Sequence, residues 1–272
     1  MARNSEDIKT FEDIRRQHFP GSKETLDAIN ARLANAMDVA LDEVQFTHLQ
    51  STAFNTKGFW RSKEGVNPED FNRHVIIQGA TSSGKTLVSE MAILDSLQNG
   101  NKKSIVLVPL RAMVRERFDQ LREDLKHQGV DKVYPSSSDY QEHDGEIIEG
   151  NFTVAVIVYE KFFAMLSQSQ SKGNGENIPM LNECPLLVVD ELQMLNSRDR
   201  GPKLEIAIQK VLENNKRSDS DLKTRIMCLT TCDCKVELIK KLADGGSRRG
   251  QKTGTDFDYE QRTSCRFARA RD

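Results

Sequence analysis

Gly79-Ala80-Thr81-Ser82-Ser83-Gly84-Lys85-Thr86 is the stretch that decides the fold, because it matches every fixed position of the phosphate-binding loop G-x-x-x-x-G-K-[ST]. The apolar run Val75-Ile76-Ile77 precedes it as a short buried strand, and apolar residues at helical spacing follow it over 87–94. In this order, the backbone N–H groups of the loop and the helix N-terminus converge on phosphate. The stretch therefore predicts a nucleoside triphosphate site, in which Lys85 neutralises phosphate charge and Thr86 can ligate magnesium.

A pair of acidic residues follows another apolar run further along the chain. The run Pro185-Leu186-Leu187-Val188-Val189 leads directly into Asp190-Glu191-Leu192-Gln193. At the carboxyl end of a strand, Asp190 can hold magnesium directly or through water, and Glu191 can orient and deprotonate an attacking water. Acid pairs also occur at solvated helix starts, so this motif gains its specificity from the phosphate loop. Together the two motifs predict a magnesium-dependent NTPase.

Apolar strand candidates alternate with helical stretches along most of the chain. This alternation predicts an α/β fold, a mostly parallel, doubly wound sheet with helices on both faces and ligands at the carboxyl ends of its strands. Two segments rich in polar residues and glycine, 58–73 and 167–178, are expected to be exposed loops. The expected strands are 75–78, 104–108, 153–158, 185–189 and 225–229, with a weaker one near 132–134.

The N-terminal segment is expected to be helical and to pack beside the nucleotide site. Its apolar residues Leu26, Ile29, Leu33 and Met37 recur at helical spacing and form one face. The sequence Pro20-Gly21-Ser22 predicts a break between two helices, with Ser22 as N-cap and Glu24 in the first turn.

Composition limits the environment of the protein. The formal net charge of −2 over 272 residues gives no basic footprint at whole-chain level, although contacts gathered in one groove need no such excess. No apolar stretch approaches the roughly 20 residues of a membrane span, and the N-terminus lacks the apolar core of a signal peptide. We therefore expect a soluble, cytoplasmic protein with no membrane contact.

Cysteine usage points to a reducing compartment. Five cysteines form no disulfide framework. Three of them, Cys228, Cys232 and Cys234, cluster at the end of a predicted strand, where they form either a structural group near a sheet edge or a zinc site. Because a second ligand pair is missing, the structural interpretation is favoured.

The motifs resemble those of superfamily two helicases, the DEAD/DEAH-like group, and within it the superkiller-like branch of DExH helicases. The resemblance covers residues 46–232 and implies a RecA-like phosphate-loop NTPase domain. Gln50 resembles the glutamine that reads adenine in this group, although a polar residue at a helix start is the alternative. In Asp190-Glu191-Leu192-Gln193 the family's usual His is replaced by Gln193, which the resemblance places among the catalytic residues with Glu191 and Lys85. Arg200-Gly201-Pro202 with Glu205 is similar to the segment after this box in the superkiller-like branch.

Four further segments resemble parts of the family that contact nucleic acid or couple it to ATP. The segment 108–116, which contains Pro109 and Arg111, is similar to a strand-to-helix segment that touches the nucleic-acid backbone. The segments 137–140 and 159–162 resemble two further backbone contacts, which implies such contacts for Ser137, Glu160 and Lys161. Leu229-Thr230-Thr231 resembles the Ser-Ala-Thr coupling segment, with Thr230 atypical in its middle, and implies a coupling function for Thr230 and Thr231.

These features divide the chain into a helical N-terminal extension (1–45), an ATP-binding RecA-like domain (46–242) and a basic, disordered tail (243–272). The resemblance implies the ATP-binding half of a helicase that acts with ATP and Mg²⁺ on single- or double-stranded DNA or RNA. It also implies a second RecA-like domain, supplied in trans or lost by truncation, that carries an arginine finger. Since such a finger contributes on the order of 10³–10⁵ in turnover, we expect this chain to bind ATP and to hydrolyse it feebly.

Two alternatives remain open. The chain could be a stand-alone module that binds ATP or nucleic acid and regulates a partner helicase. It could also be an unrelated phosphate-loop kinase, which the segments at 109–112 and 159–161 argue against.

Overall fold

The protein is described here from a computed structural model, which describes residues 7–19, 23–56, 59–60, 74–98, 102–172, 178–218 and 223–231. Its centre is a six-stranded sheet in the order β1-β6-β5-β2-β4-β3, and all neighbouring strands pair in parallel. The α/β fold with a parallel sheet is thus confirmed. The strands are β1 (Val75–Gln78), β2 (Ser104–Val108), β3 (Val133–Ser136), β4 (Val154–Val158), β5 (Leu186–Val189) and β6 (Arg225–Thr230).

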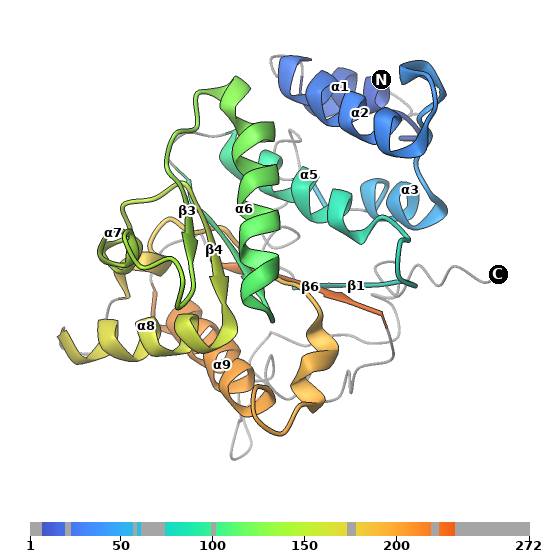
Figure 1. Cartoon of the computed structure of the whole chain (residues 1–272). Helices are drawn as coiled ribbons and strands as arrows, with labels where there is room; N and C mark the ends of the chain where they lie inside the picture. The colour runs from blue at the N-terminus through green and yellow to red at the C-terminus, as the bar shows by residue number, and fades with distance from the viewer. Residues whose placement is uncertain are drawn as a thin grey trace.

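Helices cover both faces of this sheet (Figure 1). Successive side chains of a strand point to opposite faces, so Val106 and Val188 join one hydrophobic cluster while Leu107 and Val189 join another. The first cluster packs against α1 (Phe11–His18), α2 (Lys23–Met37), α3 (His48–Phe54), α5 (Lys85–Leu97) and α6 (Arg111–Leu125). The second packs against α7 (Asp144–Glu149), α8 (Tyr159–Lys172), α9 (Gly201–Arg217) and the 3-10 turns η3 (Pro179–Leu181) and η4 (Leu192–Asn196). Two further 3-10 turns, η1 (Leu41–Glu43) and η2 (Lys126–Gln128), lie in connections.

The N-terminal helices belong to the same core as the sheet. Leu26 and Ile29 of α2 are each 1% exposed and lie in the cluster that contains β1 and β2 residues. Glu24 lies in the first turn of α2, as expected, whereas Ser22 lies outside the described residues. Met37 differs from the expectation of a buried face, because it closes the helix and is 53% exposed.

Some expectations on loops and on the tail have different outcomes. The prediction of a loop over 167–178 is wrong for its first part, since α8 continues to Lys172 and buries Ser169. The run of Ser and Gln over 167–171 produced the misleading loop pattern. The tail 243–272, most of 58–73, Cys232 and Cys234 lie outside the described residues. The described part of 58–73, Phe59 and Trp60, is buried and not exposed as expected, because both rings pack into the hydrophobic core. Cys228 is buried in β6. The proposed domain boundaries stay predictions.

Because all strands are parallel, their carboxyl ends meet at one edge of the sheet. The residues that follow β1, β5 and β6 lie together at one end of this edge, and those that follow β2, β4 and β3 lie at the other. We call these the nucleotide half and the groove half. In the described part of the chain, none of the helices has the length and apolar character that crossing a membrane requires.

Candidate active site and nucleic-acid interface

The phosphate loop connects β1 to α5 through backbone conformations that only a few residue types tolerate. Gly84 is the N-cap of α5 and has φ +83°, in the left-handed region. A Cβ atom there would lie 2.0 Å from Gln50 Nε2, so both backbone and space require glycine. Ser82 has φ +64° without being glycine. Such strain is typical of functional loops.

Lys85 is held against its own loop. Its ammonium group donates to the carbonyl oxygens of Gly79 at 2.7 Å and Ala80 at 2.6 Å. Burial lowers the pKa of Lys85, while the charges of Glu191 and Asp190 oppose that fall. The cation is therefore positioned at the mouth of the loop, beside the N-terminus of α5, where a phosphate would find both charge and free N–H groups.

The start of α3 clamps the phosphate loop from the other side. Thr47 is the N-cap of α3, and Gln50 completes a capping box: its Oε1 accepts from Thr47 N at 2.8 Å. The same two side chains reach the loop, because Thr47 Oγ1 donates to Ser83 O at 3.0 Å and Gln50 Nε2 donates to Gly84 O at 3.2 Å. Gln50 thus has the helix-start function that we considered as an alternative. Its reading of adenine stays a prediction.

The acidic box lies immediately after β5. The Asp190 carboxylate accepts from Glu191 N at 2.9 Å, and the Asp190 carbonyl accepts from the buried Tyr159 hydroxyl. Burial, with the nearby charge of Asp190 in second place, raises the pKa of Tyr159, which therefore stays a neutral donor. Glu191 has φ +52°, which turns the chain sharply away from the strand.

Gln193 joins the acidic box to the end of β6. Its Nε2 donates to Glu191 Oε2, while its Oε1 accepts from Thr230 Oγ1 at 3.0 Å and from Thr231 N at 3.4 Å. An amide can donate and accept at once, which allows one side chain to make both connections. Glu191 and Gln193 of the predicted catalytic group are therefore connected directly to the predicted coupling residues Thr230 and Thr231.

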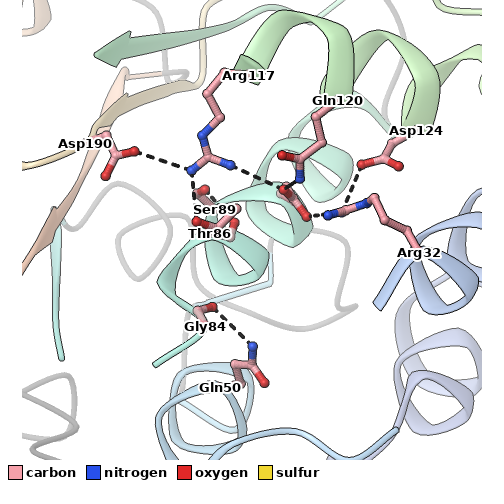
Figure 2. A network of polar contacts seen from close by, with 10 residues as sticks. Arg32, Gln50, Gly84, Thr86, Ser89, Arg117, Gln120, Asp124 and Asp190 are labelled. Atoms are coloured by element: carbon pink, nitrogen blue, oxygen red, sulfur yellow. Dashed lines mark hydrogen bonds and ion pairs between the residues drawn. The ribbon is translucent and has the colours of Figure 1, made fainter. Parts of the chain in front are cut away.

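Thr86 and Asp190 meet at a single nitrogen atom. Arg117 Nη2, from α6, donates to Thr86 Oγ1 at 3.2 Å and lies 3.4 Å from Asp190 Oδ2 (Figure 2). Two hard oxygen atoms that could ligate a metal, from separate elements, thus lie beside the same positively charged group. Hydroxyl and carboxylate oxygens are the donors that Mg²⁺ prefers, so this pair fits the predicted metal.

Arg117 is a site residue that the sequence analysis did not find. It is only 7% exposed, and its Nη1 lies 3.3 Å from Oε1 of Glu90, which is itself buried in α5. Burial raises the pKa of Glu90, while the charges of Arg32 and Arg117 oppose that rise. One signal was available: Arg117 falls on the apolar stripe of its helix, between the buried Val114 and Leu121.

The groove half carries a surface hollow of about 430 Å³, lined by residues from four connections. Arg200 braces it, because its Nη1 donates to the Pro109 carbonyl at 2.9 Å and its Nε lies 3.1 Å from Glu160 Oε1. The preceding turn also requires Gly201, whose Cβ would lie 2.2 Å from Leu195 O. The lining residues are Pro109, Arg111, Ser138, Gln141, Val158, Glu160, Lys161 and Arg200.

The predicted backbone contacts in this hollow differ in their exposure. Arg111 is 65% exposed and lies 3.8 Å from Asp139. Lys161 is mostly buried, donates to Ser137 O at 2.6 Å and pairs with Asp144 at 2.6 Å. Ser137 is fully buried and its hydroxyl accepts from Asp139 N at 3.1 Å, so its neighbour Ser138 lines the surface instead. Contact of these residues with nucleic acid stays a prediction.

A parallel sheet with a phosphate loop after β1 and an acidic box after β5 defines a phosphate-loop NTPase domain of the RecA-like class. A profile of the DEAD/DEAH box helicase family matches residues 64–233. The chain therefore belongs to the DEAD/DEAH box helicases and contains the first RecA-like domain of that family.

Relatives with curated descriptions agree with this assignment. The chain is 33% identical over 139 residues to the ATP-dependent DNA helicase Hel308 of Pyrococcus horikoshii, which covers 51% of this chain and 18% of that protein. It is 30% identical over 151 residues to Hel308 of Methanocaldococcus jannaschii, which covers 54% of this chain and 12% of that protein. The chain thus spans a small part of the length of these relatives.

Solved structures show the same fold. The DUF1998 helicase MrfA superposes with a TM-score of 0.53 at 15% identity, over 79% of this chain and 31% of that chain. The same protein bound to DNA and AMPPNP gives a TM-score of 0.54 at 16% identity, over 81% and 28%. At such identity the likeness concerns the fold alone.

Proposed function

We propose that this chain is the ATP-binding half of a DExH-type DNA helicase, in which ATP binding at the nucleotide half changes the grip of the groove half on a DNA strand. The observation that carries the proposal is the meeting of Thr86 and Asp190 at one point. A phosphate loop and an acidic box brought together in this way serve phosphoryl transfer.

In the nucleotide half, residues 79–86 surround the phosphates, and Lys85 releases the Gly79 and Ala80 carbonyls to neutralise the β/γ charge. Thr86 and Asp190 would hold Mg²⁺, which when bound would offset the charge of the phosphate oxygens. Glu191 orients and deprotonates the attacking water, and Gln193 positions Glu191 through their hydrogen bond. Gln50 contacts adenine from the start of α3.

In the groove half, we infer that DNA backbone passes over the hollow between Arg111 and Lys161. Positive and polar groups that are not arranged to read base edges bind nucleic acid without regard to sequence. The Hel308 relatives are DNA helicases and the MrfA structure holds DNA, so DNA is the first polymer to test. RNA is the comparison.

We propose that the signal to the groove half begins at Gln193, which contacts Glu191 on one side and Thr230 and Thr231 on the other and so links the acidic box to the proposed coupling segment within the nucleotide half. A second RecA-like domain or a partner in trans would supply the cation that completes catalysis. We also propose a cytoplasmic location, which agrees with the free, buried thiol of Cys184.

The test is binding of a fluorescent ATP analogue with Mg²⁺, followed by steady-state phosphate release with and without single-stranded DNA. We expect saturable binding, and release near background from this chain by itself. Glu191→Gln should leave binding intact. Robust DNA-stimulated release that disappears in Glu191→Gln would contradict the half-enzyme proposal, because it would require the finger within this chain or a second copy of it.

Two other outcomes separate the alternatives. Binding of ATP and DNA without release, even when a second helicase domain is added, would favour a module that regulates a partner. Stimulation by RNA alone would change the polymer and keep the mechanism.

A further inference from the structure

Arg117 is a buried cation of the nucleotide site, 7% exposed, that the proposed chemistry does not use. Its guanidinium contacts the hydroxyl of Thr86 and the carboxylate of Asp190 through one nitrogen (Figure 2). The other nitrogen contacts Glu90. All three partners are oxygen acceptors, and two of them are the proposed metal ligands. A permanent positive charge therefore stands where a divalent cation would bind.

This guanidinium is anchored from behind by a buried network. Glu90 is 3% exposed; its Oε1 also accepts from Gln120, and its Oε2 accepts from Arg32 of α2 at 2.8 Å. Arg32 donates in addition to Asp124 Oδ2 at 3.1 Å. A buried charge without partners would be strongly destabilising, so the network explains how Arg117 can be kept inside the fold.

The contacts of Arg117 conflict with those of a bound metal. Mg²⁺ needs its oxygen ligands at about 2.0–2.1 Å, and like charges so close to one another repel strongly in a buried site. Nη2 must therefore move away from Thr86 and Asp190 when the metal binds. The Glu90 carboxylate, already 3.3 Å from Nη1, is the group that can receive it.

We propose that Arg117 is a positioning residue that acts as a built-in cation of the metal site: it aligns Thr86 and Asp190, and it competes with Mg²⁺ for them. This inference rests on the proposed function, since it takes those two residues as metal ligands. It adds that nucleotide without metal is stabilised by Arg117, whereas the Mg²⁺ complex of the nucleotide is opposed by it. The site thereby adjusts how strongly nucleotide binding depends on magnesium.

The experiment measures the affinity of a fluorescent ATP analogue in saturating Mg²⁺ and again in EDTA. The quantity compared is the ratio of the affinity with Mg²⁺ to the affinity in EDTA. In Arg117→Gln we expect tighter binding with Mg²⁺ and weaker binding in EDTA, so that the ratio rises about tenfold, or about 1.4 kcal/mol. Arg117→Lys keeps the charge and should raise the ratio less. Arg122→Gln is the matched control, because it removes the same charge from an exposed position of the same helix and should leave the ratio unchanged.

The ratio distinguishes this function from a purely structural one. A side chain that only stabilises the fold changes both affinities alike, so an unchanged or lower ratio in Arg117→Gln would overturn the proposal. If Arg117→Gln does not fold by circular dichroism, Arg117→Lys decides in the same way. A wild-type chain without Mg²⁺-dependent binding would contradict the proposed function as well, whereas normal wild-type binding with unchanged ratios contradicts only this inference.

Discussion

The two halves of the sheet edge differ in how firmly their side chains are held. In the nucleotide half, Gln50 and Gln193 each join two separate elements through hydrogen bonds, and Arg117 reaches this half from α6 to contact Asp190. In the groove half, Arg111 is 65% exposed and has a single carboxylate at 3.8 Å. Recognition of a phosphoryl group and a metal needs fixed donors, while binding of a polymer backbone needs mainly charge. The difference in rigidity agrees with the proposed division of labour.

The groove half is not loose throughout. Arg200 connects the Pro109 carbonyl to Glu160 and so braces the walls of the hollow, while Arg111 at its rim is 65% exposed. The charge of Arg111 can therefore be removed by mutation without disturbing the contacts of Arg200. Mutations in the two halves should have separable effects.

The largest effect is expected from Lys85→Ala. Loss of this ammonium removes charge-assisted contacts to phosphate, and we expect the affinity for a fluorescent ATP analogue to fall about a hundredfold, or about 2.7 kcal/mol. DNA binding, measured without nucleotide, should not change. Lys132→Ala, at an exposed position, is the control. An equal loss of both kinds of binding would show that the two halves are not separable.

The next effect tests how tightly the nucleotide half is fitted. In Gly84→Ala a methyl group would lie 2.0 Å from Gln50 Nε2 at φ +83°, so it adds backbone strain and displaces the amide that clamps the loop. We expect a loss of about 2–3 kcal/mol in the free energy of unfolding by urea denaturation.

Gly129→Ala supplies the control for that substitution. Gly129 has φ +67°, but no atom lies within 4 Å of its Cβ position. In this variant the free energy of unfolding should therefore fall only by the cost of the left-handed backbone conformation, about 1 kcal/mol. Equal losses in the two variants would mean that the contact with Gln50 contributes nothing.

Much of the fold could be predicted because buried parallel strands leave a strong trace in sequence. The run 104–108 has the same bounds as β2, and 225–229 differs from β6 by one residue. The weakest expectation, near 132–134, concerns β3, which lies at the edge of the sheet and contains Pro135. Proline cannot donate to the ladder and is tolerated at such an edge, so its presence obscured the strand.

The candidate site could be predicted only as far as local patterns extend. The phosphate loop is contiguous, and the φ of +83° at Gly84 requires glycine, so the motif over residues 79–86 is readable from sequence. Arg117 occupies the apolar stripe of α6, but this periodicity does not tell which partners a buried cation has, and only the fold brings it to Asp190. The sequence predicted Ser137 as a surface contact, whereas Ser138 lines the hollow. Motif spacing does not tell which side chain of a turn faces outward.

A smaller effect is expected from Gln193→Ala, which removes the connection between Glu191 and Thr230. Affinity for the ATP analogue should remain near wild type. In the wild type, a nonhydrolysable analogue should change DNA affinity by about fivefold, which is typical of coupled sites, and this change should be lost in the variant. Fluorescence anisotropy of labelled DNA measures it. If the change persists in Gln193→Ala, coupling passes through another contact.

The smallest effect is expected at the rim of the groove half. Arg111→Ala should weaken binding of single-stranded DNA about threefold and equally for all sequences, because an exposed cation contributes less than about 1 kcal/mol. The slope of log affinity against log salt should become shallower by about 0.7, the contribution of one neutralised phosphate on a single strand. Arg122→Ala, exposed further along the same helix, should change neither quantity. A marked sequence preference, or a salt slope unchanged by Arg111→Ala, would place the DNA path elsewhere and would remove the contrast between a rigid nucleotide half and a charge-driven groove half.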